Sequence, residues 1–297
     1  MSIIARHPAP HDIPEGRQFA WLVPYLQKAE IDAVLSQNPF RVVDHRPLDQ
    51  VVQDARQAAT GLRPYVMQPV QALSADLQPA ADSVRSRDVF RREYDAKFDA
   101  AFGMVALDSL IAPQPLADLD YVETLMDHLP AAPDLLQDFH FAFPEEPIPE
   151  PVVVGNTVTF ASHAPNIYVA PVPTYRRVSG GYEIVVRAES RPNYLFVAEL
   201  AGVGGRLILV NGVHHVLAMI KAGRKQAPAV VRRAIMVQEL GIPPTTLLGQ
   251  ISAARPPLVK DFFSPCAVSV VKRVTAVATQ VLFQTNQVMF PADGPTG

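Results

Sequence analysis

Hydrophobic residues in the first half of the chain recur mostly at helical spacing. One series runs from Phe19 to Leu35, where Pro24 predicts a kink or a helix that begins at the proline. A second series runs from Pro47 to Thr60. It opens with proline and is followed by Gly61, which are common signals for the start and the end of a helix. The pattern therefore predicts a mainly helical region.

Aromatic residues repeat at steps of four positions between Ser86 and Gly103. They are Phe90, Tyr94, Phe98 and Phe102. This spacing predicts one helix whose aromatic side faces the core. The apolar run from Met104 to Ile111 predicts a short buried strand, and Asp118 is placed to cap a helix that Pro130 ends.

The pattern changes between Pro144 and Pro151, where proline occupies nearly every second position. Such a segment forbids helix and favours a stiff, extended connector. Beyond it, a hairpin is predicted around Gly155 and Asn156. Further strands are predicted over 167–172, 182–186, 194–200, 206–210 and 228–232, and the tail over 268–290 is predicted as strand, in the form of a hairpin.

These patterns predict an α+β chain in three parts. A mainly helical region covers 1–143, the proline-rich connector covers 144–151, and a mixed α/β domain with C-terminal strands covers 152–297. The chain has 297 residues, of which 48% are hydrophobic, so it has ample material for a packed core. Its single cysteine, Cys266, excludes a disulfide scaffold. With no apolar run near the roughly 20 residues that cross a bilayer, and no secretory leader pattern, we expect a soluble cytoplasmic protein.

The net charge of −3 hides an asymmetry. Residues 1–150 hold 23 acidic and 12 basic residues, a balance of −11, whereas residues 151–297 hold 6 acidic and 14 basic residues, a balance of +8. This division indicates two regions with different partners, or two regions that face each other; solvated charges with no partner are an equal alternative.

One segment, from Leu207 to Val231, carries more information than the rest. A buried strand runs into a turn at Asn211 and Gly212, and a helix follows with Val213, Leu217 and Ile220 on one face. Gly223 closes that helix, and a strand begins at Pro228. The order is therefore strand, turn, helix and strand.

This layout resembles the ParB/sulfiredoxin-like superfamily, whose hallmark is a strand, an Asp/Asn-Gly-x-His-Arg turn, a helix and a later Val-Pro-Val strand. The matching residues are Asn211, Gly212, His214, Ala218, Gly223, Pro228 and Val230. The resemblance implies the fold of that superfamily for the second half. His215 stands where the family usually has arginine, and Val213 stands where sulfiredoxins have their catalytic cysteine, so cysteine chemistry is excluded.

The same residues indicate anion binding without reference to any family. A glycine turn at a helix N-terminus presents backbone N–H groups to a phosphate. Between Leu200 and Gln238 there is no acidic residue, and the basic residues are Arg206, Lys221, Arg224, Lys225, Arg232 and Arg233. We therefore expect a nucleotide or another phosphorylated ligand at this turn. The predicted catalytic residues are His214 and His215, and the predicted ligand-binding residues are Arg191, Asn193, Asn211, Gly212, Val213 and Arg224.

Two alternatives stay open. The histidines could satisfy backbone carbonyl groups inside a structural crossover, and the chain could be a non-catalytic interaction or assembly protein that keeps the fold. Its acidic half would then bind a protein partner or dock on the basic half. The identity of any cofactor stays open, with a nucleotide as the candidate. An isoelectric point near 6.2 argues against general nucleic-acid binding.

Other constellations are weaker. His128, His140 and His163 lack zinc-like spacing to one another or to Cys266, so no metal site is expected. The segment from Pro257 to Phe263 is predicted to dock on the core through its apolar side chains, which are Leu258, Phe262 and Phe263.

Overall fold

The computed structural model describes residues 16–37, 41–95, 100–145, 150, 152–154, 157–161, 167–169, 174–185, 188–190, 193–201, 205–240, 242, 246–272 and 278–282. The chain divides into two compact units. Unit 1 comprises Met1–Ala9, Glu146–Arg191 and Thr275–Gly297, and unit 2 comprises Pro10–Glu145 and Pro192–Val274.

This division differs from the predicted one, because strands from both halves of the sequence share sheets in unit 2. Strand β4 (Ala101–Ala106) pairs with β14 (Gln226–Ala234), and β1 (Arg17–Trp21) pairs with β15 (Val268–Lys272). The region before residue 144 is thus mixed helix and strand and does not form a separate helical body. Most of the predicted connector, at 146–149 and 151, lies outside the described residues.

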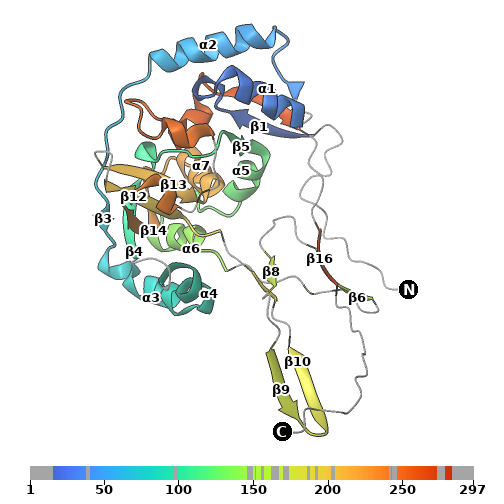
Figure 1. Ribbon diagram of the computed structural model, residues 1–297. Coiled ribbons are helices and arrows are strands. Elements are labelled where there is room, and N and C mark those ends of the chain that lie inside the picture. The colour runs from blue at the N-terminus through green and yellow to red at the C-terminus, as the bar shows by residue number, and fades with distance from the viewer. Residues whose placement is uncertain are drawn as a thin grey trace, which may run out of the picture. The chain divides into compact units, whose positions relative to one another are not determined.

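The first sheet of unit 2 has four antiparallel strands in the order β2 (Arg41–Val42), β15, β1 and β5 (Leu116–Asp118). Helices α1 (Lys28–Gln37) and α2 (Leu48–Thr60) lie at the same end of the unit as this sheet (Figure 1). Helix α2 begins after Pro47 and ends at Gly61, as predicted. A helix that starts at Phe19 is wrong, because residues 17–21 pair with two neighbouring strands. A short 3-10 helix, η1 (Val23–Tyr25), begins around Pro24, and the α-helix begins at Lys28.

The second sheet has five strands in the order β13 (Arg206–Asn211), β12 (Phe196–Leu200), β14, β4 and β3 (Gln71–Ala72). Strands β12 and β14 are parallel, and the other pairs are antiparallel. Helix α7 (Val213–Lys221) connects β13 to β14, so the predicted order of strand, helix and strand is confirmed. Helix α5 (Leu119–Met126) packs on α7, and α6 (Leu135–Ala142) packs on β14.

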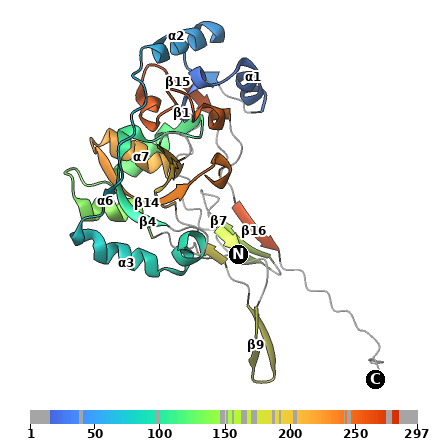
Figure 2. The same ribbon diagram turned by 60° about the vertical axis from the view of Figure 1, so that its left-hand side comes forward.

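The far end of unit 2 holds α3 (Gln78–Ser86), α4 (Asp88–Phe90) and a π-helical turn (Arg91–Asp95), as Figure 2 shows for α3. The single aromatic helix that the spacing predicts is wrong, because Phe102 lies on β4; Phe98 lies outside the described residues. The aromatic cluster itself forms. Phe90 stacks on Tyr94 and on Phe102 with ring centroids 5.1 and 5.2 Å apart, and Phe90 is fully buried.

Unit 1 contains short antiparallel pairings. Strands β16 (Ala278–Leu282), β7 (Thr157–Ala161) and β6 (Val152–Val154) form one sheet, which confirms the pairing of the predicted hairpin. Strand β9 (Thr174–Val178) pairs with β10 (Gly181–Val185), and β8 (Ile167–Val169) pairs with β11 (Ala188–Ser190). The tail is strand, as predicted, over 268–272 and 278–282, but β15 and β16 do not form a hairpin with each other, because β15 pairs with β1 and β2 whereas β16 pairs with β7. The rest of 268–290 lies outside the described residues.

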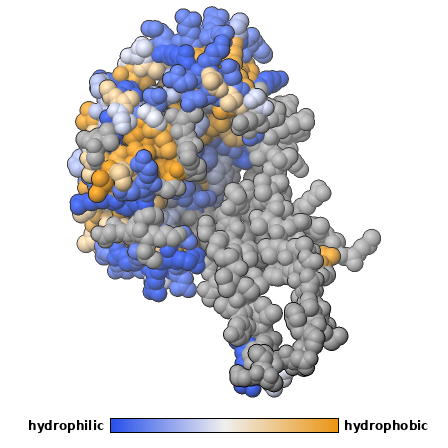
Figure 3. Space-filling model, viewed as in Figure 1, coloured by the Kyte–Doolittle hydropathy of each residue, from blue (hydrophilic) through white to orange (hydrophobic). Residues whose placement is uncertain are grey.

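The core of unit 2 is built from large side chains of both sequence halves, with Trp21, Phe90, Phe139 and Tyr194 fully buried. Hydrophobic residues also reach the surface between hydrophilic ones (Figure 3). Exposed large apolar side chains of unit 2 include Val66, Ile235, Met236 and Phe263. Among the described residues, no helix is both long enough and apolar enough to cross a bilayer.

Candidate functional site

The turn that the sequence singles out connects β13 to α7. Asn211 ends the strand, and Gly212 caps the helix in a left-handed conformation with φ of +92°. A Cβ atom at Gly212 would lie 3.1 Å from the Cα atom of Leu195, so the glycine is required by close packing on a neighbouring backbone. Val213 is buried, with 8% of its surface exposed. The strand, turn and helix form as predicted, but Gly212 packs against the Leu195 backbone and not against a ligand.

His214 binds to the end of a neighbouring strand. Its Nε2 atom accepts a hydrogen bond from the backbone N–H of Asp118 at 3.1 Å, and its ring packs edge-on against Tyr121 with centroids 5.2 Å apart. Burial, followed by the charges of His215 and Arg17, lowers the pKa of His214 to about 4. The ring is therefore neutral near pH 7. Because Nε2 accepts, the proton is assigned to Nδ1.

His215 lies inside the core. Only 6% of its surface is exposed, and its ring packs edge-on against Phe141 with centroids 5.0 Å apart. Burial lowers the pKa of His215 to about 4. Both predicted catalytic residues thus pack against protein side chains, and the backbone group that His214 binds is an N–H and not the carbonyl that the structural alternative expected.

Arg224 forms a buried ion pair. Its Nε atom lies 3.1 Å from Asp138 Oδ2, and the two side chains are 3% and 5% exposed. Its Nη2 atom also donates to the carbonyl oxygens of Pro130 at 2.6 Å and Ala132 at 3.0 Å. This arginine fixes the segment before α6 and is fully engaged. Of the other predicted ligand residues, Asn193 is partly buried and Arg191 lies outside the described residues.

Ion pairs lie around the predicted site in unit 2, and some of them join the acidic half of the sequence to the basic half. Asp118 accepts from Arg17 Nε at 3.2 Å, Lys221 pairs with Glu123, and Arg224 pairs with Asp138. Burial is the main cause that raises the pKa of Asp118 above its ordinary value. Two of these three pairs join the acidic half to the basic half, so that part of the charge asymmetry is neutralised inside the unit.

The backbone amides at the start of α7 are the part of the predicted site that has no hydrogen-bond acceptor among the described residues. The N–H groups of Val213, His214 and His215 have no acceptor in the part of the chain that the structure describes, since the first helical bond is made by Val216 to Gly212. Anion binding at this turn therefore stays a prediction.

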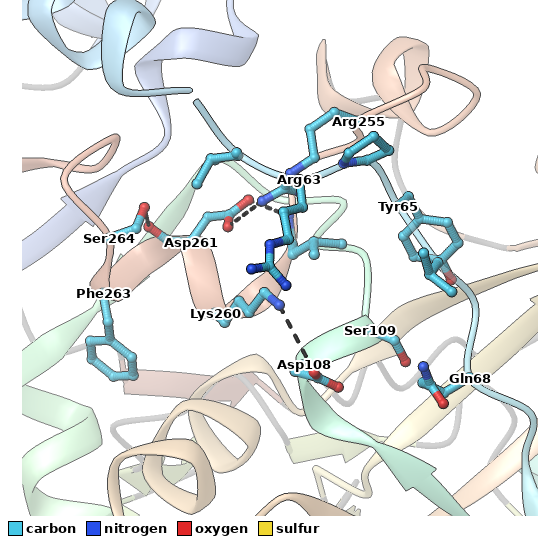
Figure 4. Close-up of a pocket in the computed structure, with 14 residues that line it drawn as sticks. Arg63, Tyr65, Gln68, Asp108, Ser109, Arg255, Lys260, Asp261, Phe263 and Ser264 are labelled. Atoms are coloured by element: carbon cyan, nitrogen blue, oxygen red, sulfur yellow. Dashed lines mark hydrogen bonds and ion pairs between the residues drawn. The ribbon is translucent and has the colours of Figure 1, made fainter. Parts of the chain in front are cut away.

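A separate cavity of about 470 Å³ lies between the extended segment after α2 and the turn η8 (Val259–Phe263). Its size is within the range of about 300–1,000 Å³ that small-molecule sites occupy. Figure 4 shows the polar side chains around it. The lining residues with charged or amide groups are Arg63, Gln68, Asp108, Arg255, Lys260 and Asp261. We call it the Arg63–Lys260 cavity.

Arg63 and Lys260 supply positive charge to this cavity. In Figure 4 both side chains enter the same space, Arg63 from the segment after α2 and Lys260 from η8. Arg63 has no ion pair or side-chain hydrogen bond with any residue that the structure describes. Lys260 Nζ lies 4.0 Å from Asp108 Oδ2, and both groups are well exposed. An exposed pair at this distance holds its partners weakly.

A buried carboxylate holds the wall that carries Lys260. Asp261 is 1% exposed and accepts from the Tyr25 hydroxyl at 2.9 Å, from Arg255 Nη2 at 2.6 Å and from the Leu258 N–H at 2.8 Å. Burial and the charge of Asp261 raise the pKa of Tyr25. These three hydrogen bonds fix η8, so the fold sets the position of the Lys260 backbone.

Tyr65 anchors the opposite wall. Its N–H donates to the Ala254 carbonyl at 3.1 Å, and its hydroxyl accepts from the Leu207 N–H at 3.0 Å. The guanidinium of Arg206 lies 5.1 Å from the centre of its ring. Tyr65 thus holds the segment that carries Arg63 against β13, although the chain enters a sheet only at β3, beyond this segment.

The sequence did not single out Arg63, Gln68 or Asp108. The segment from Pro257 to Phe263 was predicted to dock on the core, and Leu258 and Phe262 are indeed buried, but Phe263 is 43% exposed at the cavity. Two prolines, Pro64 and Pro69, were the available signal that the segment after α2 is extended. Their sequence position does not reveal which wall they face.

Comparisons with known proteins add no family to this picture. No protein-family model, no curated protein and no solved structure matches the chain. Among the described residues, no group of three or more His, Cys, Asp or Glu side chains is placed to hold a metal ion.

Proposed function

We propose that the chain binds a phosphorylated small molecule, and that the ligand occupies the Arg63–Lys260 cavity. The observation that supports the proposal most is the convergence of two cationic side chains on one cavity, where Arg63 lacks an acidic partner among the described residues. Guanidinium and ammonium groups are the usual protein donors to phosphate. A nucleotide, the cofactor candidate, belongs to the same ligand class.

The proposal keeps the predicted ligand class and changes its location. The turn at Gly212 is packed on Leu195. His214 is half-buried and His215 is buried, and both are neutral near pH 7. Arg224 is paired with Asp138. The cavity uses none of these residues. A relationship to the ParB/sulfiredoxin-like superfamily and a cytoplasmic location remain proposals, the first supported by the order of β13, α7 and β14.

The test is calorimetric titration with inorganic phosphate as the probe, on wild type and two variants. Arg63→Gln and Lys260→Gln each remove one charge from the cavity, and each should weaken phosphate binding about tenfold, because a charge-assisted hydrogen bond is worth about 1.5–3 kcal/mol. The matched control is Lys225→Gln, which removes a charge from an exposed residue outside the cavity and should leave the affinity unchanged.

Binding that is equally strong in all four proteins would contradict the cavity as the site. If neither phosphate nor a panel of nucleotides and sugar phosphates binds wild type, the proposal is wrong, and the alternative of an interaction or assembly protein is favoured.

A further inference from the structure

The residues that line the Arg63–Lys260 cavity supply two kinds of chemistry. Arg63 and Lys260 supply only donors and positive charge. Asp108 and Ser109, from the turn η4 (Leu107–Ser109), together with Gln68, supply acceptors nearby (Figure 4). The Ser109 hydroxyl donates to the Ala106 carbonyl at 2.9 Å, so its oxygen is left to accept.

Asp108 is the decisive residue. Its carboxylate is 70% exposed and lies 4.0 Å from Lys260 Nζ. A phosphate placed on Lys260 meets this negative charge, and like charges at such a distance repel. Asp108 therefore weakens the binding of inorganic phosphate at Lys260 without preventing it. If the ligand carries a hydroxyl next to its phosphate, that hydroxyl can donate a hydrogen bond to the Asp108 carboxylate, and the interaction becomes favourable.

We propose that the ligand is a phosphorylated polyol, such as a sugar phosphate. Its phosphate lies between Arg63 and Lys260, and a neighbouring hydroxyl donates to Asp108. The inference rests on the proposed function, because it needs phosphate in this cavity.

The Tyr65 ring of the cavity gives little support to a nucleotide. Tyr65 is fastened at its N–H and its hydroxyl, and the Arg206 guanidinium lies over its ring. The Tyr65 ring is thus already part of the cavity wall and is not free to stack on a nucleobase.

The experiment compares glycerol 3-phosphate with propyl phosphate, which share a three-carbon chain and a phosphate and differ in two hydroxyls. Wild type should bind glycerol 3-phosphate about tenfold more tightly, the value of one hydrogen bond to a charged group. In Asp108→Asn, propyl phosphate should bind a few-fold more tightly, because a repelling charge is gone. Glycerol 3-phosphate should bind more weakly, so the preference should shrink to about twofold or less.

The matched control is Asp88→Asn. Asp88 is also exposed and also lies 4.0 Å from a cation, Arg91, but it is outside the cavity. This variant should keep the tenfold preference. The melting temperature of Asp108→Asn should equal that of wild type, because the side chain is exposed.

The outcomes separate the two proposals. If neither compound binds wild type, the proposed function fails. If both bind wild type equally and Asp108→Asn strengthens both alike, phosphate binding stands and the polyol inference is overturned. Adenosine monophosphate that binds more tightly than ribose 5-phosphate would also overturn it, in favour of a nucleotide.

Discussion

The backbone N–H of Asp118 donates a hydrogen bond to Nε2 of His214 at 3.1 Å, so a histidine at the start of α7 holds the end of strand β5. Asp118 in turn caps helix α5, because its Oδ1 atom accepts the Tyr121 N–H at 3.0 Å. It also pairs with Arg17 on β1 at 3.2 Å. The His214–Asp118 pair thus joins strand β5 of the first sheet to helix α7, which follows β13 of the second sheet.

Removing the imidazole should destabilise the protein. In His214→Ala the Asp118 N–H loses its acceptor in a largely buried place, and the free energy of unfolding should fall by about 2 kcal/mol. The measurement is urea denaturation at pH 7. His128→Ala is the control, because His128 is exposed, and it should change the stability by less than about 0.5 kcal/mol. If His214→Ala and His128→Ala are equally stable, His214 has no structural role.

The two histidines also predict how stability depends on pH. Their folded pKa values, about 4, lie below the ordinary value of 6.5, so the unfolded chain binds protons first as the pH falls. Stability is therefore complete above about pH 6.5 and decreases toward pH 4, by about 2 kcal/mol for each ring at pH 5. The raised pKa of Asp118 acts in the opposite direction, because the folded protein binds this proton more readily than the unfolded chain does.

The measurement is the urea midpoint at pH 7, 6 and 5. His215→Phe, which keeps an aromatic ring beside Phe141 and cannot be protonated, should lose roughly half of the decrease between pH 7 and pH 5. A variant with the full wild-type decrease would show that His215 does not titrate as the burial implies.

The local structure around the motif could be predicted because each element carries its own signal. Gly212 and Gly223 mark the ends of α7, and both adopt positive φ angles. Asp118 was predicted as a helix cap and is one. Such signals depend on a few neighbouring residues, so one sequence suffices to find them.

Pairing between distant segments could not be predicted in the same way. Residues 17–21 have hydrophobic spacing that suits a helix, yet β15 and β5 offer them hydrogen-bonding partners more than 90 positions away. Phe102 lies on β4 for the same reason, since β14 pairs with it. The function of a charge likewise depends on its distant neighbours: Arg224 was expected to meet a ligand and instead meets Asp138.

That buried pair gives a third prediction. Arg224→Met should lower the free energy of unfolding by about 3–5 kcal/mol, because it leaves the Asp138 carboxylate buried without its cation. The double variant Arg224→Met with Asp138→Leu should recover part of this loss. Lys221→Gln is the control, since its pair with Glu123 is exposed and should contribute less than about 1 kcal/mol. Chemical denaturation of the four proteins measures the differences, and a loss in Arg224→Met no larger than that in the control would contradict the prediction.

The last prediction separates the turn at Gly212 from the cavity. Gly212→Ala places a Cβ atom 3.1 Å from the Leu195 Cα atom at a φ of +92°. The Leu195 backbone cannot easily retreat, because its N–H donates to Ala142 and its carbonyl accepts from Val230. The variant should lose about 3 kcal/mol of stability, of which about 1–2 kcal/mol is left-handed strain.

Gly223→Ala is the control for that strain. Gly223 has a φ of +77° and no atom within 4 Å of an added Cβ, so this variant should lose only the 1–2 kcal/mol of strain, about half as much. Both variants, measured at a temperature where they remain folded, should bind phosphate with wild-type affinity, because the Arg63–Lys260 cavity contains neither glycine. Loss of binding in folded Gly212→Ala with normal binding in Gly223→Ala would return the site to the amides at the start of α7, where no protein acceptor lies among the described residues.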